Sequence, residues 1–304
     1  MANAFSPIFI AGPTATGKSE IALTLAEKIG GEIISVDSMQ VYRGLDIGTA
    51  KPDAATRKRI PHHLIDVCDL AEPFDAAKFV QLANRTVAEI ESRKRVPVFC
   101  GGTGLYFKAF LEGIGEAPPA DETLRAELEA MPLAQLLEEL RERDPAAYDA
   151  IDKQNPRRVI RALEVIRLTG KRFSSQRSSW NAQPATGSKL LLFTRSAADL
   201  RRRIDVRVDE MFRRRLVEET RELLKHGLAE NKTAMQAIGY RQVVEHLRGE
   251  RALAGTIELV KIRTRQFAKR QLTWYRRHGN CQWIELQPEE TVEEILRRLA
   301  HFFV

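Results

Sequence analysis

The sequence predicts an α/β protein with a doubly wound parallel sheet and an inserted all-helical domain. An apolar run at 7–11 leads into a glycine-rich loop and then into a helix with apolar periodicity. Further apolar runs at 32–36, 64–67 and 96–100 alternate with helical stretches, and this alternation is typical of a parallel sheet. The stretch 123–170 is rich in Leu, Glu and Arg, has helical periodicity and shows no strand pattern, so we expect a separate helical domain there.

The chain is expected to form two domains. Pro118 and Pro119 interrupt the pattern after the fourth apolar run, and consecutive prolines commonly mark a boundary between elements. We therefore assign residues 1–117 and 186–304 to the core, and residues 118–185 to the inserted helical domain.

The segment after the helical stretch is expected to lead the chain back into the core. Residues 173–188 are rich in Ser, Gln and Asn and predict a linker. An apolar run at 189–193 predicts another core strand, and a run at 282–286 predicts the closing strand. Between these two strands the pattern is mostly helical, with helix ends expected at Gly227 and Gly249.

The composition suits a soluble globular protein, because 43% of the 304 residues are hydrophobic and 29% are charged. The formal net charge is +7, and residues 201–280 contain 20 lysines and arginines against 10 acidic residues. This regional surplus exceeds the surplus of the whole chain. A single basic run commonly forms a solvated helical face, but a surplus of this size favours a polyanion such as RNA as a partner.

The cysteines and the first residues indicate the compartment. Cys68, Cys100 and Cys281 stand far apart and lack the paired spacing of a zinc site. No apolar run is long enough for a membrane span, and residues 1–6 lack the basic flank and apolar core of a signal peptide. We expect a cytoplasmic protein with no membrane segment and no structural zinc.

The glycine-rich loop matches the P-loop (Walker A) pattern, in which backbone N–H groups curl around phosphate oxygens. Its residues are Gly12, Pro13, Thr14, Ala15, Thr16, Gly17, Lys18 and Ser19. Lys18 would supply a positive charge, and the Ser19 hydroxyl would bind a phosphate-bound Mg²⁺. The pattern predicts a polyphosphate ligand without identifying it. Asp37, which follows the second apolar run, could equally be the metal-binding aspartate of a nucleotide hydrolase or kinase.

Six separated blocks make the assignment more specific. Besides the P-loop, they lie at 37–52, 101–106, 158–165, 236–241 and 269–276. In this order they resemble the tRNA dimethylallyltransferase family, also called the tRNA isopentenyltransferase or IPP transferase family, over nearly the whole chain. The resemblance implies transfer of the dimethylallyl group from dimethylallyl diphosphate to N6 of adenosine 37 in tRNAs that read codons beginning with U. The products would be i6A37 and diphosphate.

The resemblance further implies that the P-loop binds the diphosphate rather than ATP, with Mg²⁺ as the cofactor. Charge builds on the diphosphate as its bond to the allylic carbon breaks, and Lys18, Ser19 through Mg²⁺, and Arg207 would neutralise that charge. Arg207 matches the family's arginine that precedes a helical methionine, here Met211. By sequence context alone, Arg207 would more often belong to a solvated basic helix.

Asp37 is the expected general base. The N6 amine of adenine is a weak nucleophile, so removing its proton as the C–N bond forms assists the reaction. Asp37 follows the second strand at the edge where ligands bind in doubly wound sheets, although an aspartate there can also cap a helix or an Asx turn. Thr103 would lie on the same edge and orient Asp37 or the amine, although an isolated threonine in a turn is more often a helix cap.

The tRNA-binding residues implied by the resemblance lie in both domains. They are Asp37, Ser38, Met39, Gln40, Thr103, Arg125, Arg157, Arg158, Val159, Ile160, Arg161, Gln236, Ala237, Ile238, Gly239, Tyr240, Arg241, Lys269, Arg270, Gln271, Leu272, Thr273, Trp274, Tyr275 and Arg276. The target adenine is expected to be flipped out into a channel lined by residues 38–40. Gln40 and Gln236 would read base edges, because an amide offers both donors and acceptors.

The basic C-terminal third adds a helical face. Lys261, Arg265 and Lys269 recur at four-residue spacing and predict one basic face for phosphates. Trp274 and Tyr275 would either stack on a base or pack inward, and inward packing is the commoner outcome for such aromatics.

Three other functions remain compatible with parts of the pattern. A small-molecule kinase would bind ATP, a non-catalytic RNA-binding module would retain the P-loop without using Asp37, and an adenylate prenyltransferase would act on free AMP. The inserted domain and the basic C-terminal third favour a macromolecular acceptor. We expect a monomer whose partners are the tRNA anticodon stem-loop and dimethylallyl diphosphate.

Overall fold

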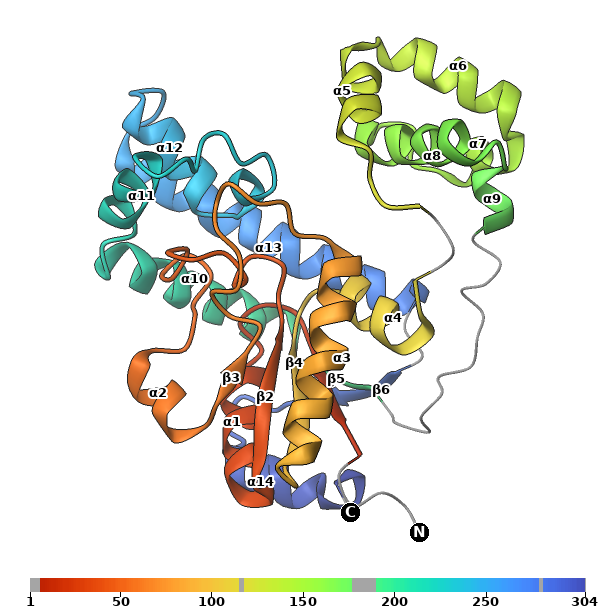
Figure 1. Cartoon of the computed structure of the whole chain (residues 1–304). Coiled ribbons are helices and arrows are strands. Elements are labelled where there is room, and N and C mark those ends of the chain that lie inside the picture. Colours follow the sequence, from red (N-terminus) through yellow and green to blue (C-terminus); the bar gives the residue numbers. More distant parts are fainter. Residues whose placement is uncertain (1–5, 115–117, 177–189, 279–280, 304) are drawn as a thin grey trace. The chain divides into compact units, whose positions relative to one another are not determined.

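A parallel sheet of six strands forms the centre of the first of two structural units, counting only the residues that the structure describes. The strands are β1 (Ile8–Ala11), β2 (Gly31–Val36), β3 (His62–His63), β4 (Val96–Gly101), β5 (Leu190–Thr194) and β6 (Cys281–Glu285). Their order is β3-β2-β4-β1-β5-β6, and neighbouring strands are parallel. With β1 inside the sheet and helices on both faces, the predicted doubly wound sheet is confirmed (Figure 1).

The structure is a computed structural model, and it describes residues 6–114, 118–176, 190–278 and 281–303. Contacts within the chain separate the described residues into a first unit, 6–110, 190–278 and 281–303, and a second unit, 111–114 and 118–176. The second unit therefore begins at Leu111, before the boundary expected at residue 118. The boundary expected at residue 185 lies outside the described residues.

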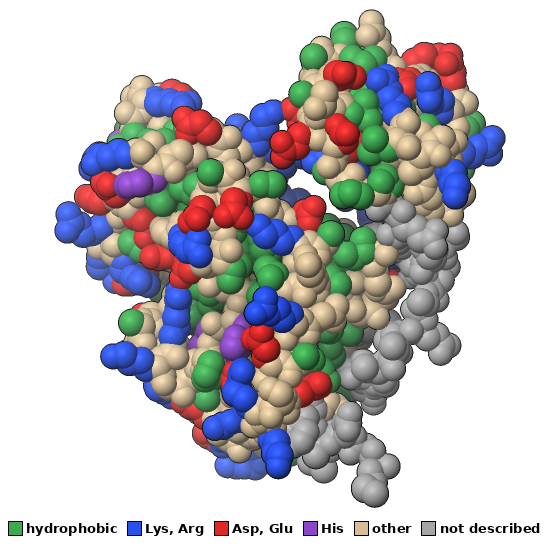
Figure 2. All heavy atoms as spheres, viewed as in Figure 1, with side chains coloured by type: hydrophobic (Ala, Val, Ile, Leu, Met, Phe, Trp, Pro, Cys, Tyr) green, Lys and Arg blue, Asp and Glu red, His purple; other side chains and the backbone are tan. Residues whose placement is uncertain are grey.

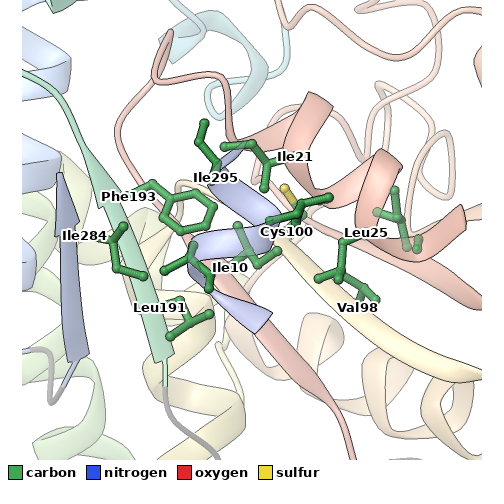
Figure 3. Packing of buried hydrophobic residues seen from close by; sticks show 14 of the residues in the cluster. Ile10, Ile21, Leu25, Val98, Cys100, Leu191, Phe193, Ile284 and Ile295 are labelled. Atoms are coloured by element: carbon green, nitrogen blue, oxygen red, sulfur yellow. The ribbon is translucent and has the colours of Figure 1, made fainter. Parts of the chain in front are cut away.

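One face of the sheet packs against two helices. Ile10 of β1 contacts the apolar layer that contains Ile21 of α1 (Lys18–Ile29) (Figure 3). Helix α14 (Val292–Arg298) lies beside α1 and adds Ile295 to the same layer. Helix α1 starts directly at the P-loop, so this packing fixes the loop against the sheet.

The other face of the sheet carries an aromatic layer. The rings of Phe9 and Phe99 stack with their centroids 4.8 Å apart. Phe110 of α4 (Gly104–Glu112) lies 4.5 Å from the Phe99 ring. Helix α3 (Ala76–Ser92) also packs on this side, against β2 and β4. Since aromatic pairs stabilise a core beyond their buried area, this layer holds the second face rigid.

The third predicted strand, 64–67, is wrong. Strand β3 consists of His62–His63 alone. Leu64 and Asp66 have φ angles of +60° and +56°, in the left-handed region that a strand excludes. Leu64 and Ile65 are buried, so the apolar run marks a buried turn.

Among its described residues the second unit contains helices and no strand, as predicted. Its helices are α5 (Glu122–Ala130), α6 (Leu133–Arg143), α7 (Pro145–Ala150), α8 (Pro156–Thr169) and α9 (Phe173–Gln176). Leu128, Leu140 and Leu163 are fully buried and form its core. The linker expected at 173–188 begins with α9, and its remainder lies outside the described residues.

The first unit is mostly helical after β5, which confirms the sequence pattern. Its helices there are α10 (Ala197–Arg213), α11 (Leu216–Leu224), α12 (Tyr240–Leu247) and α13 (Leu253–His278), with short 3₁₀ turns at Ala234–Gln236 and Ala300–Phe302. Gly227 and Gly249, where helix ends were expected, have φ angles of +89° and +81° and follow α11 and α12. Helix α2 (Ala54–Arg59) was not predicted. None of the described helices has the length and apolar character needed to cross a membrane.

Charged side chains of both signs share the surface of the first unit (Figure 2). Arg43 pairs with Asp69 at 2.6 Å, and Lys78 pairs with Glu72 at 2.8 Å. Exposed pairs of this kind contribute little to stability. A surface lysine or arginine is therefore not by itself a sign of RNA binding, and its ionic partners have to be considered one by one.

Candidate active site

A cavity of about 380 Å³ lies at the carboxyl ends of β1, β2 and β4 in the first unit. Many of the predicted site residues line it, namely Thr14, Lys18, Ser19, Asp37, Ser38, Met39, Gln40, Thr103, Arg207, Gln236, Ala237, Ile238, Arg270 and Gln271. They come from the P-loop, from the loops after β2 and β4, and from α10, α13 and the segment before α12. The fold thus brings together residues that are up to 257 positions apart, at the edge where doubly wound sheets bind ligands.

The backbone of the P-loop adopts left-handed conformations that most residues disfavour. Gly17 has φ +97°, in the left-handed region, and so does Ala15 with φ +66°. A Cβ on Gly12 would stand 2.7 Å from the carbonyl oxygen of Phe193 in β5, so the loop needs glycine to pass that strand. The Lys18 ammonium donates to the carbonyl oxygen of Pro13 at 3.2 Å, which holds the charge over the loop.

Two arginines that were not predicted as site residues donate hydrogen bonds to the carbonyl groups of this loop. The Nε of Arg195 donates to the carbonyl oxygen of Thr16 at 2.7 Å, and the Nε of Arg203 donates to that of Ala15 at 2.9 Å. Arg195 is also paired with Asp199 at 3.0 Å. Because the carbonyls are held on the outside of the loop, its N–H groups face the other way, as anion binding requires.

Three charges meet at the cavity. Burial lowers the pKa of Lys18, and the nearby Arg207 lowers it further, against the opposing effects of Cys100 and Asp37. Burial likewise lowers the pKa of Arg207, and Asp37 acts in the opposite direction. Two cations therefore share one carboxylate, and the surplus positive charge suits an anionic ligand.

The Asp37 carboxylate is held by its own turn. Its Oδ1 accepts hydrogen bonds from the backbone N–H groups of Met39, at 2.8 Å, and Gln40, at 3.2 Å. The Asx turn considered from the sequence is therefore present. In the described part of the chain no hydrogen bond to Oδ2 occurs, so one oxygen fixes the carboxylate and the other can accept a proton.

Thr103 acts on the backbone beside Asp37 rather than on the carboxylate. Its Oγ1 accepts a hydrogen bond from the N–H of Ser38 at 3.1 Å. Thr103 was expected to orient Asp37 or the amine, and among the described residues its hydroxyl holds the residue after Asp37 and makes no hydrogen bond to the carboxylate. A Thr103 substitution would loosen the Asp37 turn.

Gln40 was expected to read a base edge, and its contacts contradict this. Its Oε1 accepts from Ser35 Oγ at 2.8 Å, and its Nε2 donates to the carbonyl oxygen of Thr49 at 3.1 Å. The amide is therefore used within the protein, where it joins the end of β2 to the loop at 46–50. Gln236 is exposed and lines the cavity, so it stays the candidate for base contacts.

Tyr240 was expected to contact tRNA, but its side chain is fully buried. Its hydroxyl accepts from the Gly48 N–H at 3.0 Å and donates to Glu219 at 2.6 Å. Glu219, which no motif indicated, also accepts from the Ile47 N–H at 3.0 Å. Tyr240 and Glu219 thus brace the loop that lines one wall of the cavity. Ala237, which was also expected to contact tRNA, is buried too.

The basic face expected on α13 is only partly present. Lys261 pairs with Asp209 at 2.8 Å and with Glu258 at 3.1 Å, and Arg265 pairs with Asp205. These pairs join α13 to α10 and compete with phosphate binding. Lys269 and Arg270 are exposed and form no ion pair with the described residues.

The two aromatics of α13 differ in their surroundings. Tyr275 is fully buried, so the expectation of a tRNA contact is wrong for its side chain. Trp274 packs against the backbone of Gly104, where a Cβ would stand 2.2 Å from the indole ring. Inward packing, the commoner outcome, is therefore what both rings show.

In the second unit, some of the residues that were expected to contact tRNA are buried and others are exposed. Val159 and Ile160 belong to the apolar core of the unit, so tRNA contact by their side chains is excluded. Arg157 and Arg158 are exposed. Arg125 and Arg161, on α5 and α8, are half-buried and donate to the carboxylate of Glu164 at 2.8 and 2.6 Å.

Replacing Glu164 by glutamine is expected to destabilise the second unit by about 1–3 kcal/mol, because Arg125 and Arg161 would lose the charge of the fully buried carboxylate that pairs with them. Burial would raise the pKa of Glu164, but hydrogen bonds from Arg161, Arg125 and the Asp121 N–H lower it overall below 4.5. A lowered folded pKa means that this stabilisation is present at neutral pH. It is lost as the pH falls from 4.5 through the folded pKa.

Amide hydrogen exchange checks this prediction locally. Glu164→Gln should reduce the protection of α5 and α8 at pH 7 and leave α1 unchanged, and the difference from the unmodified protein should shrink at acid pH. Glu142→Gln, an exposed position on α6, is the matched control. Equal protection in the two variants would mean that the ion pairs do not stabilise the unit.

Apolar side chains complete the cavity, and the sequence did not reveal them as site residues. Val208 and Met211 of α10 and Val260 and Phe267 of α13 line it together with the polar loops. On their helices they read as ordinary core positions, since an apolar face gives no sign of what it covers. The cavity therefore has a charged end at the P-loop and an apolar side.

The chain is similar to proteins of one family. Residues 40–278 match the IPP transferase family. The tRNA dimethylallyltransferase of Geobacter metallireducens is 44% identical over 283 residues, which cover 91% of this chain and 92% of the relative. The crystal structure of the full-length tRNA isopentenylpyrophosphate transferase from Bacillus halodurans aligns with a TM-score of 0.71 and 38% identity, over 99% of this chain and 97% of that chain.

A eukaryotic dimethylallyltransferase acting on tRNA also aligns with the chain. Its TM-score is 0.81 at 28% identity, over 97% of this chain and 78% of that chain. The sequence blocks, the P-loop cavity and these relatives agree, which confirms the resemblance seen in the sequence. The chain belongs to the IPP transferase family.

Proposed function

We propose that this chain is a tRNA dimethylallyltransferase that moves a dimethylallyl group from dimethylallyl diphosphate to N6 of an adenosine in tRNA. Its relatives of that name match over most of the chain. The cavity that joins the P-loop, Arg207 and Asp37 supports the proposal, because it offers cations for a leaving diphosphate and a carboxylate for a departing proton.

The donor would bind with its diphosphate in the P-loop and its five-carbon chain against the apolar side of the cavity. Ser19 follows Lys18 in the first turn of α1, and its exposed hydroxyl is a suitable ligand for Mg²⁺. The described residues contain no group of three or more His, Cys, Asp or Glu side chains that could hold a metal. Ser19 would hold Mg²⁺ at the P-loop, and the ion would neutralise charge on the diphosphate.

The reaction follows from this placement. The bond between the allylic carbon and the diphosphate oxygen breaks, and its electron pair leaves with the diphosphate. Lys18 and Arg207 stabilise the charge as it develops. The N6 nitrogen forms the new bond to the allylic carbon and loses a proton to Asp37, whose Oδ2 is free to accept it. Ser38 and Met39 would contact the flipped adenine beside the carboxylate.

The acceptor would be adenosine 37 in the anticodon stem-loop of tRNAs that read codons beginning with U. The exposed Arg157, Arg158, Lys269, Arg270 and Arg276 supply cations for its phosphates. The enzyme would act as a monomer, since the residues proposed for the chemistry all lie in the first unit of one chain.

Replacing Lys269 by glutamine is expected to raise the KM for tRNA about 3- to 10-fold and to reduce the salt slope of tRNA binding by about 1. The reason is that Lys269 is an exposed cation with no acidic partner among the described residues. Binding measured over a range of salt concentrations checks it. Lys261→Gln is the matched control, since Lys261 is already neutralised by Asp209 and Glu258. Equal slopes in the two variants would contradict the prediction.

Transfer of label tests the function directly. Purified protein is incubated with Mg²⁺, dimethylallyl diphosphate carrying label in its prenyl group, and either unmodified tRNA, the same tRNA with guanosine at position 37, or AMP. Label in the first tRNA only is the expected result. Label on AMP alone would indicate an adenylate prenyltransferase. Absence of transfer, together with turnover of ATP in a parallel incubation that contains ATP and Mg²⁺, would indicate a kinase. Either outcome would overturn the proposal.

A further inference from the structure

The side-chain amide of Gln271 connects two loops of the cavity. Gln271 lies on α13 and is buried. Its Oε1 accepts a hydrogen bond from the backbone N–H of Thr14 in the P-loop at 3.0 Å. Its Nε2 donates to the carbonyl oxygen of Gly102, after β4, at 2.9 Å. A residue far away in the sequence therefore joins the loop for the diphosphate to the loop that precedes Thr103.

The side-chain amide of Gln271 fits closely between the two loops. A Cβ on Gly102 would stand 2.3 Å from the Gln271 Nε2 and 3.3 Å from the carbonyl oxygen of Gly12. The two loops thus approach each other at a glycine, and the amide fills the space left between them. Both ends of the amide are hydrogen-bonded, so its orientation is fixed and its loss would leave a buried donor and acceptor without partners.

This contact changes what the P-loop can bind. A P-loop holds a polyphosphate through successive backbone N–H groups, and each group that binds elsewhere is lost to the ligand. Pro13 has no N–H, and the N–H of Thr14 is used by Gln271. The free backbone N–H groups therefore begin at Ala15 and continue to Ser19, and Thr14, which lines the cavity, offers no free backbone N–H.

The same contact sets the distance between the two ends of the reaction. Gly102 precedes Thr103, which holds the Ser38 N–H next to Asp37. Gln271 therefore links the loop for the leaving group to the turn of the proposed base through its own two hydrogen bonds and the bond between Thr103 and Ser38. Since small displacements of reacting groups cost much rate, a fixed separation matters for the chemical step.

We propose that Gln271 is a positioning and specificity residue that restricts the P-loop to diphosphates and fixes its separation from Asp37. This rests on the proposed function, in which the ligand of the loop is a prenyl diphosphate. With the Thr14 N–H occupied, a third phosphate meets no backbone donor at that end of the loop. The protein thereby discriminates against the nucleoside triphosphates that share the P-loop pattern.

Binding of two inorganic ligands separates the two effects. Pyrophosphate and tripolyphosphate are titrated by calorimetry, with Mg²⁺, into the unmodified protein, Gln271→Met and Gln271→Glu. The methionine has a similar length and removes both hydrogen bonds. The glutamate keeps an acceptor for the Thr14 N–H and loses the donor to Gly102. Gln266→Met, at an exposed position on the same helix, is the control.

The unmodified protein should prefer pyrophosphate, and Gln271→Met should reduce that preference about 10-fold by freeing one donor for a charged ligand. Gln271→Glu should keep the preference. Both variants should lower kcat for prenyl transfer more than they change the KM for dimethylallyl diphosphate. An unchanged preference in a folded Gln271→Met protein would overturn the proposal.

Gly102→Ala provides the same test from the other loop, should Gln271→Met fail to fold. Its Cβ would displace the amide, so the preference should fall in the same way. An unchanged preference in this variant also overturns the proposal. Failure of the proposed function is recognised separately, because the unmodified protein would then not transfer label from dimethylallyl diphosphate to tRNA at all.

Discussion

Replacing Asp37 by asparagine is expected to lower kcat for prenyl transfer about 10²- to 10⁴-fold, the usual contribution of a general base. The asparagine carbonyl can still accept from the Met39 and Gln40 N–H groups, so the turn should persist. What is lost is the oxygen that takes the N6 proton. Single-turnover transfer to tRNA measures the effect, and the melting temperature should stay within the error of the unmodified protein.

Asp37→Ala is the comparison that separates chemistry from structure. It removes the acceptor of the turn as well as the base, so we expect a further loss of about 1 kcal/mol in the free energy of unfolding. Similar transfer rates in the asparagine and alanine variants, with only the alanine variant destabilised, would support a base. An asparagine variant that keeps more than about a tenth of the normal rate would fall outside the range for a base and rule out this role.

Replacing Arg207 by glutamine is expected to lower kcat about 10²- to 10³-fold, as for removal of one preorganised donor from a site of developing charge. Arg207 lies in the cavity with Lys18, burial lowers the pKa of both groups, and Arg207 lowers the pKa of Lys18 further. The charge is therefore poorly screened by water and acts strongly on the diphosphate. The KM for dimethylallyl diphosphate should rise less than kcat falls, because the charge grows as the bond breaks.

Arg201→Gln is the matched control for this prediction, because Arg201 is exposed on the same helix, α10. It should leave kcat unchanged. Arg207→Lys keeps the charge without the fork geometry and should restore part of the rate. If Arg201→Gln and Arg207→Gln reduce kcat equally, Arg207 belongs to a general basic surface. The interpretation of Arg207 as the residue that neutralises the leaving diphosphate would then be wrong.

The parts of the site that could be predicted are those formed by residues that are adjacent in the sequence. The P-loop is one continuous segment between β1 and α1, so its spacing alone indicates a phosphate site. Asp37 could be predicted for the same reason, because it directly follows an apolar strand. The order of strands and helices likewise gave the sheet, since each run of residues carries its own period.

The parts that could not be predicted depend on partners that are distant in the sequence. Gln40 and Tyr240 stand in blocks that resemble tRNA-binding segments, yet their polar atoms bind backbone groups of the loop at 46–50. Glu219 stands in no such block and braces the same loop. A polar side chain looks the same in the sequence whether its partner is a nucleotide or a buried peptide group. Only the fold distinguishes the two.

The strand predicted at 64–67, where the structure has an irregular turn, was wrong for a related reason. Apolar residues at 64–67 have the composition of a strand, but Leu64 and Asp66 adopt left-handed backbone. Their conformation is imposed by tertiary contacts, such as the pairing of Asp66 with Lys51 and Arg57, at 2.5 and 2.7 Å. Local propensity carries no information about such contacts.

The position of β1 has a consequence for synthesis of the chain on the ribosome. Its two neighbours are β4, which emerges early, and β5, which emerges only after the whole second unit. Until then one side of β1 is an unpaired apolar edge, and such edges are templates for aggregation. The helical insertion therefore prolongs the most vulnerable stage of the nascent protein by the time that synthesis of the insertion takes.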